Sequence, residues 1–261
     1  MHEMAHLFIF GLGYTSRCIA TAAKSQAWTI SATGSSGDVN FADEAGMMAQ
    51  IAHADYILSS VPPADGGDPV LSSYGAALSG KRIGYLSSTG IYGDTGGAWV
   101  DEAAPIGIGR RNLRADCDAE WLARGGQIFR LPGIYGPGRN PLERIRSGKA
   151  HRIDLPEQVF SRVHVSDIAS GVLAAISQNA PAGAYNLGDD MPCSQNAVIE
   201  EGCRLIGQKL PPLQSLDEAD LSEMARGFYA ENRRVANGKA KRLLGWKPAF
   251  PTYREGLRSL L

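Results

Sequence analysis

The chain has 261 residues, of which 44% are hydrophobic and 20% charged, and its formal net charge is −1. This length buries one full core, as a single domain or a domain with a small appended lobe. The near-zero charge argues against a nucleic-acid or acidic-membrane partner held by bulk electrostatics. No apolar run reaches the ~18 residues of a membrane span, and we see no signal-peptide pattern. We therefore expect a cytoplasmic protein.

Cysteine and histidine spacing predicts no metal site. The four cysteines lack a Cys-x-x-Cys pair, which is the usual signature of metal or redox chemistry. Among the five histidines only His2 and His6 lie four apart, and they precede the first predicted strand rather than sharing a helix face. We expect reduced thiols and no bound metal.

Strand and helix patterns alternate over most of the chain. Short apolar runs that end in small or polar residues indicate buried parallel strands, and three-four apolar spacing indicates helices. The predicted strands are His6–Phe10, Trp28–Ala32, Asp55–Ser59, Arg82–Ser87 and Gln127–Arg130, and the predicted helices are Tyr14–Gln26, Asn112–Ala123 and Val165–Ile176. This alternation predicts an α/β fold with a Rossmann-type, doubly wound parallel sheet.

The alternation weakens from about Asp189 onward, which predicts a change of architecture. We expect residues 1–188 to form the Rossmann domain. Residues 189–261 are expected to form a small C-terminal α/β substrate lobe that does not fold independently. Residues 136–160 are expected to contribute to that lobe.

A glycine-rich turn, Gly11-Leu12-Gly13-Tyr14-Thr15-Ser16, joins the first strand to the first helix. Gly11 permits the tight turn, and Gly13 lets the backbone approach a pyrophosphate without an intervening Cβ. Ser16 replaces the usual third glycine with another small residue. A turn between a strand and a helix start predicts NAD or NADP binding, while a plain connecting turn is the alternative.

The second strand ends in Thr33-Gly34-Ser35-Ser36, and no acid lies between Gly11 and Asp38. NAD-specific folds usually place Asp or Glu about 20 residues after the turn, where it bonds the ribose 2′-hydroxyl. Without that carboxylate a 2′-phosphate is not repelled, so NADP is favoured over NAD. Arg17 can supply charge there, or lie on the helix surface.

Five later segments carry recognisable motifs: Leu86–Asp94, Arg130–Gly138, Phe160–Ala169, Tyr185–Gly188 and Leu244–Pro248. They resemble the NAD-dependent epimerase/dehydratase family, the extended short-chain dehydrogenase/reductases. Within that family, Ser60-Val61-Pro62-Pro63, Gly67-Asp68-Pro69 and the short length resemble the atypical YeeZ-like branch. With the strand ends, the resemblance implies a cofactor-binding set of Gly11, Gly13, Tyr14, Thr15, Ser16, Thr33, Ser35, Ser59, Val61, Pro62, Ser87 and Pro132.

The resemblance implies a reaction centre of one hydroxyl residue and a Tyr-x-x-x-Lys pair on the following helix. Ser88 matches the hydroxyl position. Arg114 matches the lysine and Arg110 the tyrosine, so the usual proton donor is missing. Arginine stays protonated at neutral pH and cannot replace it. Tyr92 or Tyr135 can substitute, although structural packing is the alternative for each.

Four further polar residues have expected roles, and two of them, Arg162 and Arg111, carry two interpretations each. Arg162 matches a family arginine that contacts substrate, or it pairs with Asp167. Arg111, with Arg110 and Arg114, forms a solvated helix face or touches an anionic ligand. We expect His164 to be a packed core residue and Asp167 to be a helix cap.

We expect an NAD(P)-dependent oxidoreductase, epimerase or dehydratase that acts on a small sugar-like or carbonyl substrate. The alternative is a non-catalytic NAD(P)-binding sensor or partner protein, because the Tyr-x-x-x-Lys pair is absent. A protein that has also lost the cofactor is the third possibility, which the glycine turn argues against. We expect a monomer or homodimer.

Overall fold

A six-stranded parallel sheet forms the centre of the computed structural model, which describes residues 4–109 and 111–261. In spatial order the strands are β10 (Gly183–Asn186), β6 (Gln127–Leu131), β4 (Ile83–Ser88), β3 (Tyr56–Ser59), β1 (His6–Phe10) and β2 (Thr29–Ala32). Every neighbouring pair is parallel. The predicted Rossmann-type α/β fold is confirmed, and β10 is the one strand of this sheet that the sequence patterns did not indicate.

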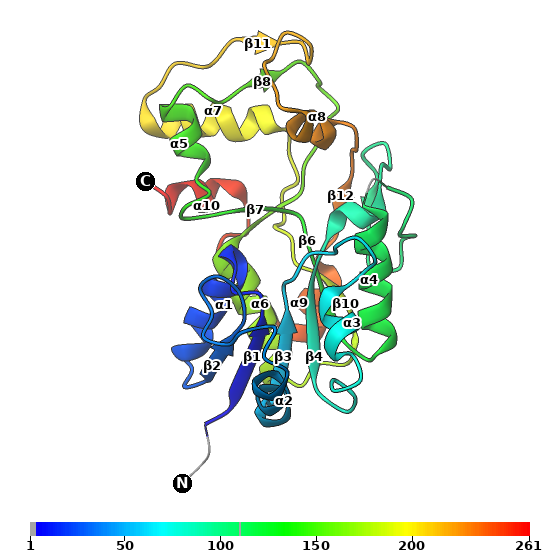
Figure 1. Cartoon of the computed structure of the whole chain (residues 1–261). Coiled ribbons are helices and arrows are strands. Elements are labelled where there is room, and N and C mark those ends of the chain that lie inside the picture. Colours follow the sequence, from blue (N-terminus) through cyan, green and yellow to red (C-terminus); the bar gives the residue numbers. More distant parts are fainter. Residues whose placement is uncertain (1–3, 110) are drawn as a thin grey trace.

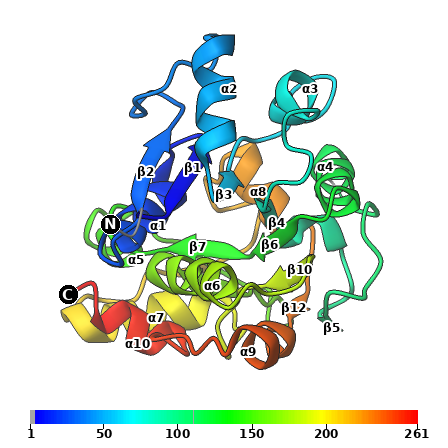
Figure 2. The same cartoon turned by 90° about the horizontal axis from the view of Figure 1, so that it is seen from below.

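Helices cover both faces of this sheet (Figure 2). One face carries α1 (Tyr14–Lys24), α6 (Val165–Ser177) and α9 (Gly238–Leu244), and the other carries α2 (Glu44–His53), α3 (Pro69–Tyr74) and α4 (Asn112–Ala123). The three predicted helices are present, whereas α2, α3 and α9 were not predicted. A sheet buried on both faces explains why its strands read as continuous apolar runs.

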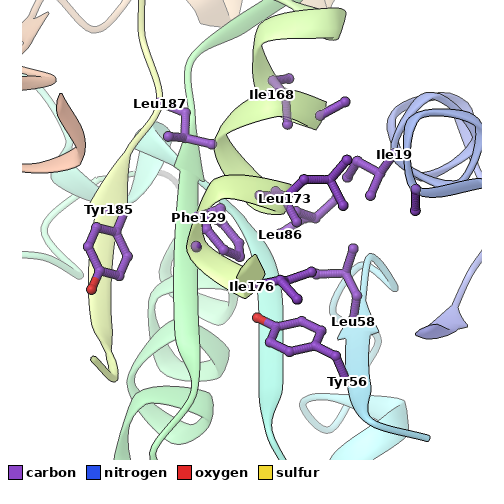
Figure 3. Packing of buried hydrophobic residues seen from close by; sticks show 14 of the residues in the cluster. Ile19, Tyr56, Leu58, Leu86, Phe129, Ile168, Leu173, Ile176, Tyr185 and Leu187 are labelled. Atoms are coloured by element: carbon purple, nitrogen blue, oxygen red, sulfur yellow. The ribbon is translucent and has the colours of Figure 1, made fainter. Parts of the chain in front are cut away.

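The larger core lies between the sheet and the α1/α6 layer (Figure 3). Ile19 of α1 and Leu173 of α6 are 0% and 3% exposed, and they pack with Leu58, Leu86 and Phe129 of the sheet. Burying each such side chain contributes about 1.5–3 kcal/mol. This packing fixes α1, and with it the glycine turn at its start.

The start of α6 corrects one prediction. His164 is the N-cap, and its Nδ1 accepts a hydrogen bond from the Ser166 amide at 3.3 Å. Asp167 does not cap the helix, because its carboxylate accepts from the amides of Ala249 and Phe250 at 2.6 and 3.1 Å. The expected cap is therefore a long-range tie to the C-terminal segment.

A smaller unit lies beyond the carboxyl ends of the strands (Figure 1). Helices α5 (Pro141–Arg146), α7 (Gln195–Ile206) and α10 (Tyr253–Arg258) enclose a core that contains Leu142, Val198 and Leu257. Its other elements are α8 (Glu223–Tyr229) and the strand pairs β8 (Arg152–Ile153) with β11 (Leu213–Gln214) and β7 (Gly133–Tyr135) with β9 (Arg162–His164).

The last part of the chain contributes to both units. β12 (Arg234–Val235) pairs with β5 (Trp99–Val100), beside the short helix η1 (Thr89–Tyr92) that follows β4. Leu244 and Trp246 then join the main core. The proposed boundary at residue 188 stays a prediction. No helix in residues 4–109 and 111–261 is both long and apolar enough to cross a membrane.

Candidate functional site

The glycine turn lies where the strand order reverses. The chain runs from β1 to β2 on one side and reaches β3 and β4 on the other, so a crevice opens at the carboxyl ends of β1 and β3. Gly11 has a φ of 83°, which an L side chain rarely adopts. Ser16 Oγ accepts from the Gly13 amide at 2.8 Å and donates to the Gly11 carbonyl at 2.6 Å. Ser16, at the position of the usual third glycine, thus stabilises the turn through its hydroxyl.

A cavity of about 870 Å³ extends from this turn toward the smaller unit. Its size is within the usual range for ligand sites. The structure brings nine of the predicted site residues together in its wall: Gly13, Tyr14, Thr15, Ser16, Ser87, Ser88, Arg114, Pro132 and Arg162. No group of three or more metal-ligating side chains occurs within the described ranges.

Other predicted cofactor residues lie outside that wall. Thr33 is buried, and its hydroxyl accepts from the Gly11 amide at 3.0 Å, so it supports the turn from beneath. Ser35 is exposed at the end of β2. Ser59 is buried, and its hydroxyl accepts from the Val61 amide at 3.4 Å. The remaining members of this group are Gly11, Val61 and Pro62.

Three buried polar atoms of the cavity-lining residues have no hydrogen-bond partner within the described part of the chain. They are the Tyr14 hydroxyl, Ser87 Oγ and Arg114 Nε. Arg114 is held by its Nη1, which donates to the Tyr85 hydroxyl at 2.8 Å. Ser88 Oγ accepts from the Gly90 amide at 3.1 Å. Unpaired buried polar atoms cost free energy, so they favour a bound hydrogen-bonding partner.

Tyr92 does not reach the cavity. Its side chain is 0% exposed, and its hydroxyl donates to Asn186 Oδ1 at 2.8 Å and accepts from Arg130 at 3.0 Å. Burial raises the pKa of Tyr92 to about 12. Tyr135, the other substitute considered, lines a neighbouring cavity, and burial raises its pKa as well. Arg110 lies outside the described residues.

The cavity wall is strongly cationic. Besides Arg114 and Arg162, it contains Arg111, Arg139, Arg144 and Arg233, while Glu231 is its one carboxylate within the described ranges. Glu231 and Arg233 form an ion pair of 2.9 Å. Sequence reasoning missed Arg139, Arg144, Tyr229 and this pair, because they come from short elements with no recognisable motif.

Arg162 is buried, yet its acceptors are neutral. It donates to the carbonyls of Phe160 and Cys193 at 2.9 and 3.0 Å and to Gln195 Oε1 at 3.0 Å. The alternative pair with Asp167 is absent, since Asp167 bonds the amides described above. His164 is packed as expected, and burial lowers its pKa to about 4, so its ring is neutral at pH 7.

Curated proteins of two kinds match part of the chain. A 3-diazoavenalumate denitrifying reductase from a Streptomyces species is 29% identical over 181 residues, which cover 60% of this chain and 58% of the reductase. Protein YeeZ of Escherichia coli is 27% identical over 181 residues, covering 65% of this chain and 59% of YeeZ. The matched region thus spans just under three-fifths of both relatives. No protein-family model matches the chain.

Solved structures match almost the whole chain. A functionally unknown conserved protein from Silicibacter pomeroyi is 37% identical with a TM-score of 0.87, and the match covers 98% of both chains. A human epimerase family protein solved with NADPH has a TM-score of 0.76 over 97% of this chain and 98% of its own, at 14% identity. At 14% identity, the likeness to the human protein concerns the fold alone. The predicted resemblance to the epimerase/dehydratase family is confirmed at the level of the fold.

Proposed function

Since the chain belongs to the family of the Silicibacter pomeroyi protein, an atypical branch with the NAD-dependent epimerase/dehydratase fold, we propose that it is an NAD(P)-dependent oxidoreductase or epimerase/dehydratase. Its substrate is a small sugar-like or carbonyl compound. The observation that carries this proposal is one cavity that runs from the glycine turn past Ser88 and Arg114. The reductase among the relatives favours hydride transfer within this range.

The start of α1 holds the cofactor pyrophosphate in this proposal. The first backbone N–H groups of the helix have no acceptor within the helix, and they lie at the positive end of its dipole. Both features favour a bound anion. The Arg139 guanidinium lies 4.4 Å from the centre of the Tyr14 ring, where Tyr14 is the first residue of α1. This cation–π contact places a positive charge beside the helix start. We add Arg139 to the cofactor-binding residues on that ground.

We further propose a preference for NADP. The first acid after the turn, Asp38, has its Oδ1 bonded to the Ala32 amide at 2.8 Å. This carboxylate supports β2 instead of accepting from a ribose hydroxyl. Ser35 is exposed at the same strand end and can donate to a 2′-phosphate. NADPH is expected to bind more tightly than NADH in a fluorescence titration, and the reverse order would overturn the preference.

At the reaction centre we assign Ser88 to the reacting oxygen of the substrate and Arg114 to the ribose hydroxyls. When bound, the nicotinamide supplies or accepts a hydride. Ser88 donates a hydrogen bond toward an oxygen that gains negative charge, and the nearby Arg114 cation stabilises that charge. Tyr92 is assigned a structural role because its hydroxyl is buried in the network with Asn186 and Arg130.

The substitution Gly13→Val tests cofactor binding. No atom lies within 4 Å of a Cβ added at Gly13, and the φ there is −87°, so the fold accommodates a side chain. The added methyl groups would enter the space proposed for the pyrophosphate. We expect at least tenfold weaker NADPH binding and a melting temperature close to that of the wild type. Gly13→Ala should be intermediate, and undiminished binding by Gly13→Val would refute the placement.

The sensor alternative is tested by turnover. The wild type and Ser88→Ala are supplied with NADPH and a panel of sugars, aldehydes and ketones. Consumption by the wild type that falls at least 100-fold in Ser88→Ala supports an enzyme with Ser88 at the reaction centre. Tight NADPH binding, no consumption with any compound and no effect of Ser88→Ala would favour the non-catalytic alternative.

A further inference from the structure

A second cavity of about 680 Å³ adjoins the first. It lies among β7, α5, α7 and α10, with apolar wall residues that include Ile134, Val198 and Leu257. The two cavities share a wall made of Gly133, Ile134, Arg139, Pro141, Arg144, Arg162 and Gln195. The glycine-turn residues and Ser88 line the first cavity only. The second cavity is therefore a chamber beside the proposed reaction centre, away from the cofactor turn.

Positive charge gathers in and beside the shared wall. Arg139, Arg144 and Arg162 line both cavities, and Lys149 lines the second. Glu143 is the one carboxylate in the lining of the second cavity among the residues the structure describes. Within that same part of the chain, none of these four cations forms an ion pair with a carboxylate.

Arg162 is the cation of this wall whose charge is buried. It is 8% exposed and bonded to carbonyl and amide oxygens, so its charge is desolvated without a counter-ion. Asp189 interacts electrostatically with Arg162, but the two side chains form no ion pair in the described residues. A buried charge is far more favourable when an opposite charge accompanies it. The wall thus has the electrostatics of an anion site.

Arg144 can reach such an anion from the rim. It is exposed, and its Nη2 donates to the backbone carbonyl of Lys149 at 3.2 Å, which ties the guanidinium to the loop after α5. A guanidinium presents paired donors that match a carboxylate or phosphate. The apolar residues behind it suit a hydrocarbon or aromatic body rather than another charged group.

We propose that the second cavity is a substrate subsite for an organic acid, which binds a carboxylate or phosphate through Arg144, Lys149 and Arg162. The apolar body of the acid lies against Ile134, Val198 and Leu257. This inference rests on the proposed function in naming the occupant as substrate. The substrate then extends from the reaction centre near Ser88, past the residues that line both cavities, into the second cavity.

The test measures binding of three small probes to the full chain saturated with NADPH, which fills the pyrophosphate site. Benzoate and phenyl phosphate carry the anion, and benzamide is the neutral counterpart of benzoate. We expect both anions to bind and benzamide to bind at least fivefold more weakly, by ligand-observed NMR titration. The tighter of the two anions identifies the acid group that the subsite prefers.

Two variants of α5 locate the binding. Arg144→Gln should weaken both anions at least fivefold. Arg146→Gln is the matched control, since Arg146 is exposed on the same helix and lines neither cavity, and it should bind as the wild type does. Equal binding of benzamide, no anion binding, or equal effects of the two variants would overturn the proposal.

A separate NADPH titration distinguishes this proposal from the proposed function. If NADPH does not bind while anion binding still depends on Arg144, the subsite stands and the nicotinamide-dependent function fails. If NADPH binds and consumes substrates while Arg144→Gln leaves anion affinity unchanged, the function stands and the subsite fails.

Discussion

Two buried arginines occupy neighbouring parts of this molecule and differ in what surrounds them. Arg130 on β6 donates to both oxygens of Asp118, at 3.0 and 2.7 Å, and the two side chains are 3% and 0% exposed. Arg162 on β9 is 8% exposed and donates to neutral oxygens. Both guanidinium groups are desolvated, but only the first has its charge matched.

The difference separates a structural network from the wall of the proposed subsite. Around Arg130 the donors and acceptors are paired with one another. Arg130 donates to the Tyr92 hydroxyl, which in turn donates to Asn186. A fully satisfied network fixes the packing of α4 against the sheet and leaves nothing for a ligand. Arg162 instead lines two cavities with its charge uncompensated. A buried charge alone therefore does not indicate a site, and it is the missing counter-ion beside a cavity that supports the proposed subsite.

The largest effect is expected at the matched pair. Asp118→Ala leaves the Arg130 charge buried without its partner, which should lower the free energy of unfolding by about 3–5 kcal/mol. Urea denaturation measures this loss. Asp116→Ala, on the exposed side of the same helix, is the control and should change stability by less than about 0.5 kcal/mol. Equal losses would mean that the Arg130 pair does not stabilise the fold.

A smaller, pH-dependent effect is expected beside Arg162. Burial raises the pKa of Asp189 to about 7, above its ordinary value of 3.8. The folded state therefore holds this proton more tightly, so the stability it confers is present below pH 4 and lost as the pH rises toward 7. Asp189→Asn removes this dependence and keeps an acceptor for the Met191 amide, 3.2 Å away.

Relative to Asp189→Asn, the wild type should lose about 2 kcal/mol between pH 4 and pH 6. Urea unfolding at several pH values between these limits gives the difference directly. A difference that stays constant with pH would show that Asp189 is ionised throughout, and Arg162 would then have a buried counter-charge nearby.

The smallest effect is expected for Tyr92→Phe, which removes one hydroxyl from the matched network. Two hydrogen bonds are lost, and the Arg130–Asp118 pair remains, so we expect a loss of about 1–2 kcal/mol. NADPH affinity and any turnover should be unchanged. A large loss of turnover at unchanged stability would instead assign Tyr92 a catalytic role and break the separation between the two regions.

Local sequence signals predicted the parts of the fold that local physics decides. The ends of the predicted strands lie within one residue of β1, β2, β3, β4 and β6. Apolar runs and helical periodicity depend on neighbouring residues, so they can be read from the chain directly. The elements that were missed are short or weakly patterned, such as α2, α3 and β10.

The candidate site was predictable where it follows a strand end. Gly13, Ser16, Ser87 and Ser88 line the cavity because the carboxyl ends of parallel strands meet at one edge of the sheet. Whether these residues hold a cofactor is a proposal that the Gly13→Val experiment addresses.

Sequence by itself therefore determined the Rossmann-type sheet and the glycine turn at its switch point. Tertiary structure alone decided which charges are matched. Asp118 lies 12 residues from Arg130 in the chain, and Asp167 bonds amides more than 80 residues away. Such pairings depend on how α4, β9 and the C-terminal segment pack, since Coulomb and hydrogen-bond energies follow distance in space and not separation along the chain.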